Sequence, residues 1–371
     1  MSPFFFPDYG NASSLHGPGR RAREALERAR TKVAAAISGQ PEEIIFTGGG
    51  SESDNLAIKG VAGERRRKGN HIITSLVEHP AVLQTCRFLE KNGFRLTYVP
   101  VDKTGLVDPG EVEEAIGPET ILITIMLANN EVGTIQPIEA IAAIARPRGI
   151  LVHTDAVQGL GKIPLDVGKL GVDLLSLSAH KIYGPKGVGA LWRRRGVKMQ
   201  AIIHGGEQER GLRAGTENVP GIVGFGCAAE LAANEIKDYD FRVRELRDLL
   251  EKEILANIGQ VYFNGHREMR LHNTLNLSFE FVEGEGIVLG LDSAGIAVST
   301  GSACSSGSLE PSHVLRAMGL SPIRAQGAIR FSLGRSNTRE EISRTVSALK
   351  ETVERLRRIS PFYRPQGEGG E

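Results

Sequence analysis

The chain has 371 residues, enough for two domains of ordinary size. Its 45 Lys and Arg residues balance 44 Asp and Glu residues, so a net charge of +1 gives no electrostatic case for direct nucleic-acid or membrane-surface binding. No apolar stretch approaches the ~20 residues of a membrane span, and the start is too short and too soon acidic for a signal peptide. Three cysteines cannot form a disulfide framework. We therefore expect a cytoplasmic protein in a reducing environment.

From about residue 44 to 194, short apolar runs alternate with longer amphipathic segments. Helical patterns lie between most of the runs, for example over residues 81–91 and 138–145. The apolar runs predict buried strands at 44–46, 72–74, 96–99, 121–125, 151–153, 174–177 and 188–192. This alternation predicts an α/β fold whose seven-stranded, mostly parallel sheet is flanked by helices.

The pattern changes after Pro220. We expect helices over about 221–236 and 241–256, separated by Asp238-Tyr239-Asp240, then strands at 261–263, 274–279 and about 329–333, and a last helix over 339–358. The sequence thus predicts a large domain of residues 1–236 and a smaller α+β domain of residues 237–371.

Lys181 directly follows a strand that is predicted to be buried. Burial disfavours the ammonium form, and a desolvated lysine of lowered pKa is the form that makes Schiff bases. The nearby Ser178 hydroxyl and His180 imidazole suit a phosphate group. A lone lysine at a strand end more often extends into water, so this interpretation depends on what lies upstream.

Asp155 lies upstream, at the carboxyl end of another predicted strand, where open α/β sheets bind their ligands. No second carboxylate or histidine lies beside it at metal-ligand spacing, so a metal site is a poor interpretation. An aspartate with a Schiff-base lysine is the pair expected of pyridoxal-phosphate enzymes. The turn Thr47-Gly48-Gly49-Gly50-Ser51 could hold the phosphate at a helix start, although a Gly-rich turn alone is weak evidence.

Together with further motifs, these segments resemble the cysteine desulfurases, the NifS/IscS-like branch of the class V aminotransferase-like family of fold-type-I pyridoxal-phosphate enzymes. The resemblance covers about residues 9–361. It rests on motifs that occur in the family's order: Gly10-Asn11-Ala12-Ser13-Ser14, Val77-Glu78-His79-Pro80, Ala128-Asn129-Asn130-Glu131, Arg213-Ala214-Gly215-Thr216-Glu217-Asn218 and Gly301-Ser302-Ala303-Cys304.

The resemblance implies a role for each matched residue. Lys181 would form the Schiff base with pyridoxal 5'-phosphate and move protons at the substrate Cα, Asp155 would pair with the ring nitrogen, and His79 would stack on the ring. The remaining cofactor contacts would come from Gly50, Ser51, Asn130, Gln158, Ser178, His180 and, across an obligate homodimer, Thr216. The substrate would be held by Asn11, Asn130 and Arg330, whose guanidinium suits a carboxylate.

Cys304 lies among small residues, in surroundings that suit a reactive thiolate, whereas Cys86 and Cys227 have apolar neighbours in sequence and are expected to be core thiols. On its own, Cys304 is as readily structural as functional. The resemblance implies that its thiolate takes sulfur from L-cysteine, giving L-alanine and a persulfide for an iron–sulfur scaffold or a tRNA-thiolation acceptor protein. No intrinsic metal is expected, although Cys304 could ligate a transferred iron–sulfur cluster.

The first residues depart from the family pattern. Family members usually begin with a strand and an Asp-x-x-Ala-Thr-Thr-like motif, and here the segment around Asn11 lies almost at the start. We therefore expect either a misplaced start or a reduced paralogue that binds cofactor but turns over slowly, acting as a scaffold partner. A selenocysteine lyase or an aminotransferase of the same fold would also fit the matched motifs.

Overall fold

The computed structural model describes residues 1–300, 311–361 and 363. Two compact units make up the chain. The first comprises Met1–Pro100, Val107–Asn129 and Gln136–Lys237, and the second comprises Val101–Leu106, Asn130–Ile135 and Asp238–Glu371. Two short segments that lie within the expected large domain, 101–106 and 130–135, are thus grouped with the second unit.

A seven-stranded sheet forms the centre of the first unit, in the order β1-β7-β6-β5-β4-β2-β3. Strands β2 to β6 pair in parallel, and β7 runs antiparallel to both of its neighbours. The sequence prediction of these strands and of a mostly parallel sheet is confirmed. Their bounds are Ile44–Thr47, His71–Ser75, Arg95–Val99, Thr120–Thr124, Leu151–Asp155, Leu174–Ser178 and Gly189–Arg193 for β1 to β7.

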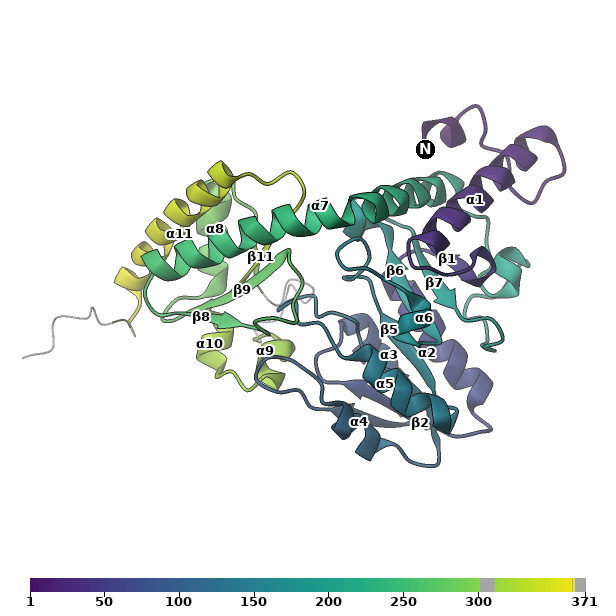
Figure 1. Ribbon diagram of the computed structural model, residues 1–371, viewed down its shortest axis with the longest axis horizontal. Coiled ribbons are helices and arrows are strands. Elements are labelled where there is room, and N and C mark those ends of the chain that lie inside the picture. The colour runs from purple at the N-terminus through teal and green to yellow at the C-terminus, as the bar shows by residue number, and fades with distance from the viewer. Residues whose placement is uncertain (301–310, 362, 364–371) are drawn as a thin grey trace, which may run out of the picture. The chain divides into compact units, whose positions relative to one another are not determined.

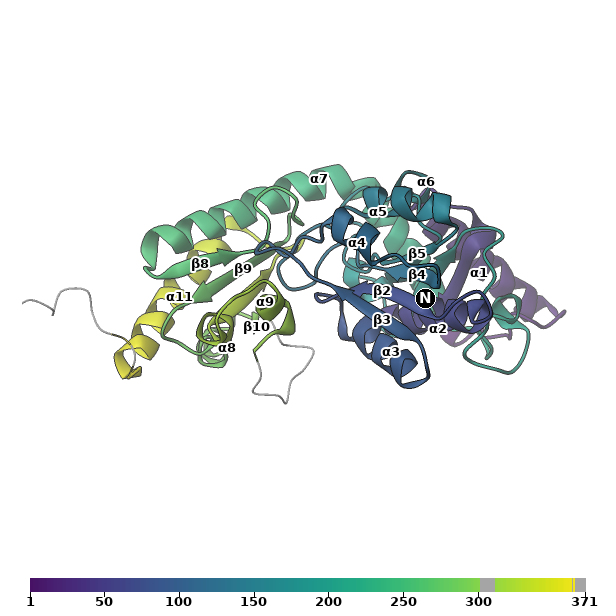
Figure 2. The same ribbon diagram turned by 90° about the horizontal axis from the view of Figure 1, so that it is seen from below.

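Helices cover both faces of this sheet, as Figure 2 shows: α2 and α3 lie on one side, and α5 and α6 on the other. The α-helices of the first unit are α1 (Gly17–Ala35), α2 (Gly50–Arg65), α3 (Pro80–Lys91), α4 (Pro109–Ala115), α5 (Ile138–Ala145) and α6 (Val167–Leu170). Short 3-10 helices are η1 (Ser2–Phe5), η2 (Pro41–Glu43), η3 (Arg146–Arg148), η4 (Ala179–Ile182) and η5 (Gln208–Gly211).

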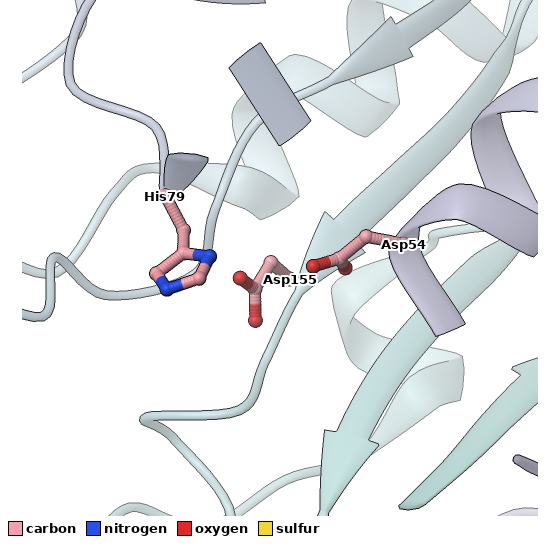
Figure 3. A group of neighbouring side chains, drawn as sticks. All are labelled: Asp54, His79 and Asp155. Carbon is pink, nitrogen blue, oxygen red and sulfur yellow. The ribbon is translucent and has the colours of Figure 1, made fainter. Parts of the chain in front are cut away.

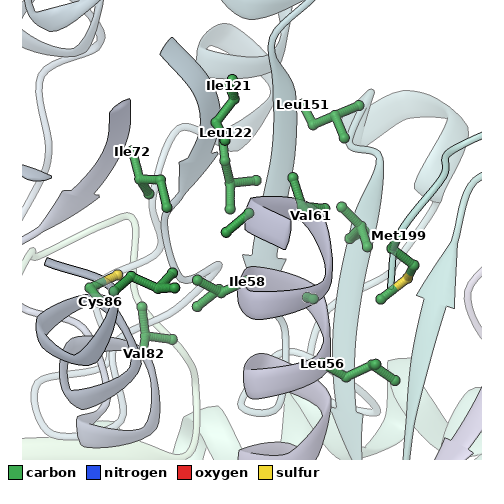
Figure 4. Packing of buried hydrophobic residues seen from close by; sticks show 14 of the residues in the cluster. Leu56, Ile58, Val61, Ile72, Val82, Cys86, Ile121, Leu122, Leu151 and Met199 are labelled. Atoms are coloured by element: carbon green, nitrogen blue, oxygen red, sulfur yellow. The ribbon is translucent and has the colours of Figure 1, made fainter. Parts of the chain in front are cut away.

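The core of the first unit lies between α2, α3 and the sheet (Figure 4). Ile58 of α2 and Val82 of α3 are fully buried, and so is Leu122 of β4. Strands covered on both faces have no solvent side, which explains why they appear in the sequence as continuous apolar runs. Cys86 is buried in this core, as expected.

An antiparallel sheet of order β10-β11-β9-β8 organises the second unit. Its strands are β8 (Val261–Asn264), β9 (Thr274–Phe279), β10 (Ser299–Thr300) and β11 (Ala328–Ser332), and its helices include α8 (Gly284–Ser293), α9 (His313–Ala317), α10 (Pro322–Gln326) and α11 (Arg339–Ile359). Helix α11 begins at a capping box formed by Thr338 and Glu341.

The predicted break between two helices at residues 238–240 is wrong. Figure 1 shows α7 as one continuous helix, and it spans Val219–Asn257. Asp238-Tyr239-Asp240 contains no Gly or Pro, and the weak helix propensity of Asp is easily overridden by tertiary contacts. Here Tyr239 packs edge-on against His272, and Asp240 pairs with Arg244 one turn later.

The expectation that Cys227 is a core thiol is also wrong, because this residue of α7 is exposed. Its neighbours Phe225 and Ala229 are fully buried. Residues two apart on a helix point to different sides, so apolar neighbours in sequence do not bury it. None of the described helices is long and apolar enough to cross a membrane.

Candidate active site

The carboxyl ends of β5 and β6 bring the predicted site residues to one edge of the large sheet. Asp155 is the last residue of β5, Ser178 is the last residue of β6, and these two strands pair in parallel. His180 and Lys181 follow at once in η4. The fold therefore places them where parallel sheets bind ligands.

Asp155 is a buried carboxylate, 7% exposed, whose Oδ1 accepts the Val157 N–H at 2.9 Å. Burial raises the pKa of Asp155 to about 6, while the Val157 N–H and the charge of Lys181 oppose that rise. A buried carboxylate with a lysine close enough to act on its charge suits a cationic ligand.

His79 is the N-cap residue of α3. Its Nδ1 accepts the Ala81 N–H at 3.1 Å, and Pro80 occupies the first helical position. An accepting Nδ1 leaves the proton of the neutral ring on Nε2. Figure 3 shows the His79 ring beside Asp155, so the cap also fixes the ring at the site.

Asp54 is a site residue that the sequence analysis missed. It lies on α2, 1% exposed, and one donor atom each of Asp54, His79 and Asp155 lies within 4.8 Å of the others. No sequence motif reveals this cluster, because the three residues come from different elements. Existing hydrogen bonds already orient His79 and Asp155, and we assign no metal here.

Glu78, also missed, joins the ends of β2 and β4. Its carboxyl group accepts the Ser75 hydroxyl at 2.6 Å and the Met126 N–H at 3.0 Å to each oxygen. Burial raises the pKa of Glu78 to about 8, although both hydrogen bonds lower it. Because Glu78 immediately precedes His79, these bonds hold the turn that presents the His79 ring.

The start of α2 forms a cradle for an anion. Gly49, the N-cap, has φ +152°, and a Cβ on Gly50 would lie 2.7 Å from Val157 Cγ2. The first N–H groups of a helix have no carbonyl partner within that helix, and Gly50 and Ser51 supply two of them here. Close by, the Ser178 hydroxyl and His180 Nδ1 share a hydrogen bond of 2.8 Å. Burial, and secondly the charge of Lys181, lowers the pKa of His180.

Lys181 is exposed, which corrects the expectation of a desolvated lysine. The strand before it is buried, but η4 turns the chain outward at the sheet edge, and Tyr183 closes this turn with φ 65°. Gln158 follows Asp155 by three residues in the sequence. Its Oε1 accepts a hydrogen bond from the Lys162 ammonium at 2.6 Å.

Thr216 is exposed in a loop that two ion pairs tie to the rest of the unit. Arg213 pairs with Glu52 of α2 at 2.9 Å, which connects this loop to the helix start described above. Glu209 pairs with Arg30 at 2.7 Å in a fully buried setting. Asn11 is exposed too, and its Oδ1 accepts the Ser13 N–H at 2.8 Å.

Two of the predicted substrate residues belong to the second unit. Arg330 of β11 donates from Nη1 to the Asn130 carbonyl at 2.9 Å, and its buried Nε has no hydrogen-bond partner among the described residues. Burial raises the pKa of the neighbouring Glu131 to about 7, while Ser312 and Arg330 lower it. Cys304 lies outside the described residues.

The residues of the first unit fit pyridoxal phosphate. Asp155 offers a buried carboxylate for a ring nitrogen, His79 offers a ring face, and the start of α2 offers free N–H groups for a phosphate. Lys181 follows the neighbouring strand. The Lys181 amine and these three features therefore lie in one unit.

Comparisons with known proteins identify the family of the chain. The family model of aminotransferase class-V matches residues 1–345, and the chain belongs to this family. It is 55% identical to cysteine desulfurase IscS of Dictyoglomus turgidum, over 98% of this chain and 92% of that protein. Among solved structures it resembles a NifS-like protein (TM-score 0.90, 44% identity, 95% of this chain and 94% of that one) and SspA in complex with cysteine (TM-score 0.79, 40% identity, 91% and 94%).

Proposed function

We propose that the protein is a pyridoxal-phosphate-dependent cysteine desulfurase, which converts L-cysteine to L-alanine and leaves the sulfur as a persulfide on Cys304. The observation that carries this is Asp155 buried at the end of β5 with Lys181 just beyond the adjacent β6. The names of similar proteins support the choice of sulfur removal among the reactions of this fold.

The cofactor would be held by residues of the first unit. Asp155 would pair with the ring nitrogen, and His79 would stack on the ring. Gln158 would form a hydrogen bond with the hydroxyl group of the cofactor ring. The phosphate would be bound by Gly50, Ser51, Ser178 and His180. When bound, pyridoxal phosphate supplies an electron sink for negative charge at the substrate Cα.

The remaining steps belong to the chain's own side chains. Arg330, whose Nε has no partner among the described residues, would bind the substrate carboxylate, and Asn130 would orient the substrate. Lys181 would carry the proton at Cα. The Cys304 thiolate, a stronger nucleophile than a neutral thiol, would attack the substrate sulfur. The S–S bond would form as the substrate Cβ–S bond breaks, and the electron pair of that bond would stay with carbon, which takes up a proton to give alanine.

We further propose that two copies of the chain act together, with Thr216 of one copy at the phosphate of the other. The persulfide would then pass to an acceptor protein, either an iron–sulfur scaffold or a tRNA-thiolation protein. The exposed position of Thr216 supports the first part, because the side chain is available to a second copy.

The test is to incubate the purified protein with pyridoxal phosphate, L-cysteine and a reductant, and to quantify alanine and sulfide. We expect equal amounts of both, and persulfide labelling at Cys304 that disappears in Cys304→Ser. Cys227→Ser, which removes an exposed thiol of α7, is the matched control. Keto acid with pyridoxamine phosphate in place of alanine would instead indicate an aminotransferase, and a persulfide at Cys86 or Cys227 would refute the role of Cys304.

A further inference from the structure

Asp54 is a buried acid that the roles above leave unexplained. It lies on α2 and is 1% exposed. Figure 3 shows its carboxyl group directed toward Asp155, and the two groups have oxygens within 4.8 Å of each other. Its Oδ1 has no hydrogen-bond partner among the described residues. Two acids this close in a buried site interact strongly.

Among the described residues, the titratable groups beside Asp54 are acids and imidazoles. His79, which lies in the same cluster, accepts the Ala81 N–H on Nδ1, as a neutral ring does. The neighbour of Asp54 on β5 is His153, whose Nε2 lies 3.7 Å from Asp54 Oδ1. Both ring nitrogens of His153 are hydrogen-bonded to hydroxyls, Nδ1 to Thr124 at 2.8 Å and Nε2 to Ser176 at 2.9 Å. Burial lowers the pKa of His153 to about 3, so its ring is neutral at pH 7. From the end of β2, Glu78 adds only a further acid.

Asp155 is better placed than Asp54 to hold a negative charge. It accepts the Val157 N–H at 2.9 Å and feels the positive charge of Lys181. Asp54 has the Ser176 hydroxyl and a neutral imidazole. When two carboxyl groups share a buried site, the pair retains one proton. The proton resides on the carboxyl group whose ionised form is stabilised less by its surroundings. Burial first, and then the charge of Asp155, raises the pKa of Asp54 well above its ordinary value.

We propose that Asp54 is a positioning residue for Asp155: it remains a neutral carboxylic acid, and it thereby leaves Asp155 as the carboxylate that faces the ring nitrogen. The identity of that nitrogen rests on the proposed function. The protonation of Asp54 does not, because it follows from residues of the chain itself.

Two isosteric substitutions ask which carboxyl group carries the charge. Asp54→Asn replaces one neutral group by another, so pyridoxal phosphate should bind within roughly threefold of the wild-type Kd and give the same absorption spectrum. Asp155→Asn removes the anion, so the Kd should rise about tenfold or more and the spectrum should change. Glu64→Gln, at an exposed position of the same helix, is the matched control. A reversed pattern, with Asp54→Asn the damaging change, would overturn the proposal.

Infrared difference spectra of the apoprotein provide a readout that needs no cofactor. Wild type minus Asp54→Asn at pH 7 should show the carbonyl band of a buried carboxylic acid, while Glu78 and Glu131, present in both proteins, cancel. Asp155→Asn should keep that band, since burial still acts on Asp54. A carboxylate band in its place would refute the proposal.

A calorimetric titration of the apoprotein with Zn²⁺ alone tests the competing role of a metal ligand. Zn²⁺ binding that both Asp54→Asn and Asp155→Asn abolish would mean that Asp54 acts as an ionised ligand, and would also overturn the proposal. If Zn²⁺ binds weakly to the wild-type protein and with the same affinity to both variants, the result supports the proposal. If wild-type protein fails to bind pyridoxal phosphate, the proposed function fails, and the infrared difference still decides the state of Asp54.

Discussion

Arg30 and Glu209 form a buried, two-pronged ion pair: Arg30 Nη1 donates to Glu209 Oε2 at 2.8 Å, and Nη2 donates to Oε1 at 2.7 Å. Glu209 also accepts the Phe46 N–H at 2.8 Å, although its own backbone lies in the left-handed region at φ 46°. The pair therefore fastens the loop that carries Thr216 to α1 and to the edge strand β1.

Removing one partner of this pair should lower the stability of the folded protein. In Glu209→Ala the Phe46 N–H loses its acceptor, and the buried Arg30 guanidinium keeps only the Ile44 carbonyl and the more exposed Glu27. We expect the free energy of unfolding to fall by about 3 kcal/mol. Urea denaturation of the apoprotein measures this change. Glu207→Ala, two residues away and exposed, should stay within about 0.5 kcal/mol of wild type. Equal effects of the two substitutions would contradict the structural role of the pair.

Glu78 should make stability depend on pH. Its folded-state pKa of about 8 exceeds the ordinary 4.5, so its contribution is full below pH 4.5 and is lost as the pH rises through about 8. Glu78→Gln stays neutral throughout. The stability of wild type relative to Glu78→Gln should therefore fall by on the order of 3 kcal/mol between pH 5 and pH 8. Urea midpoints at several pH values test this, with exposed Glu90→Gln as control; parallel wild-type and Glu78→Gln curves would rule it out.

Lys181 should be the covalent anchor of the cofactor. Borohydride treatment of the holoprotein should fix the cofactor to the peptide that contains Lys181, and Lys181→Ala should lose this labelling. Lys186→Ala, which removes another exposed lysine just after η4, should keep it. Labelling that persists in Lys181→Ala would assign the anchor to another lysine.

The proposed action of Thr216 across two copies has a distinctive signature. Homodimers of Lys181→Ala and homodimers of Thr216→Val should each form little alanine from L-cysteine. The first lacks the anchoring lysine, and the second lacks a hydroxyl at the cofactor phosphate. Mixed dimers formed by refolding the two variants together should regain one intact site, because Lys181 of one chain would meet Thr216 of the other. Alanine formation in the mixture well above that of either variant is the expected result. No gain on mixing would place Thr216 in its own subunit's site.

The strands could be predicted from the sequence because their burial leaves a continuous apolar run, as at Ile121-Leu122-Ile123. Asp155 was predictable for a related reason, since it lies two residues after the strand predicted at 151–153. Asp54 was not predictable, because its significance depends on the packing of α2 against β5, the strand that ends at Asp155. The exposure of Lys181 and Cys227 depends on where a turn or a helix face points, and residue type does not encode that direction.

In the proposed site, His79 would meet two requirements with one side chain: it caps α3, and it would stack on the cofactor ring. Asparagine or aspartate at this position would still cap α3 but would offer no ring to stack, and phenylalanine or tyrosine would offer a ring but leave the Ala81 N–H without its acceptor. If the proposed stacking holds, substitutions at position 79 change helix stability and cofactor retention together. In a library of all substitutions at position 79, selection for folding and selection for cofactor would favour different residues, and histidine alone would satisfy both.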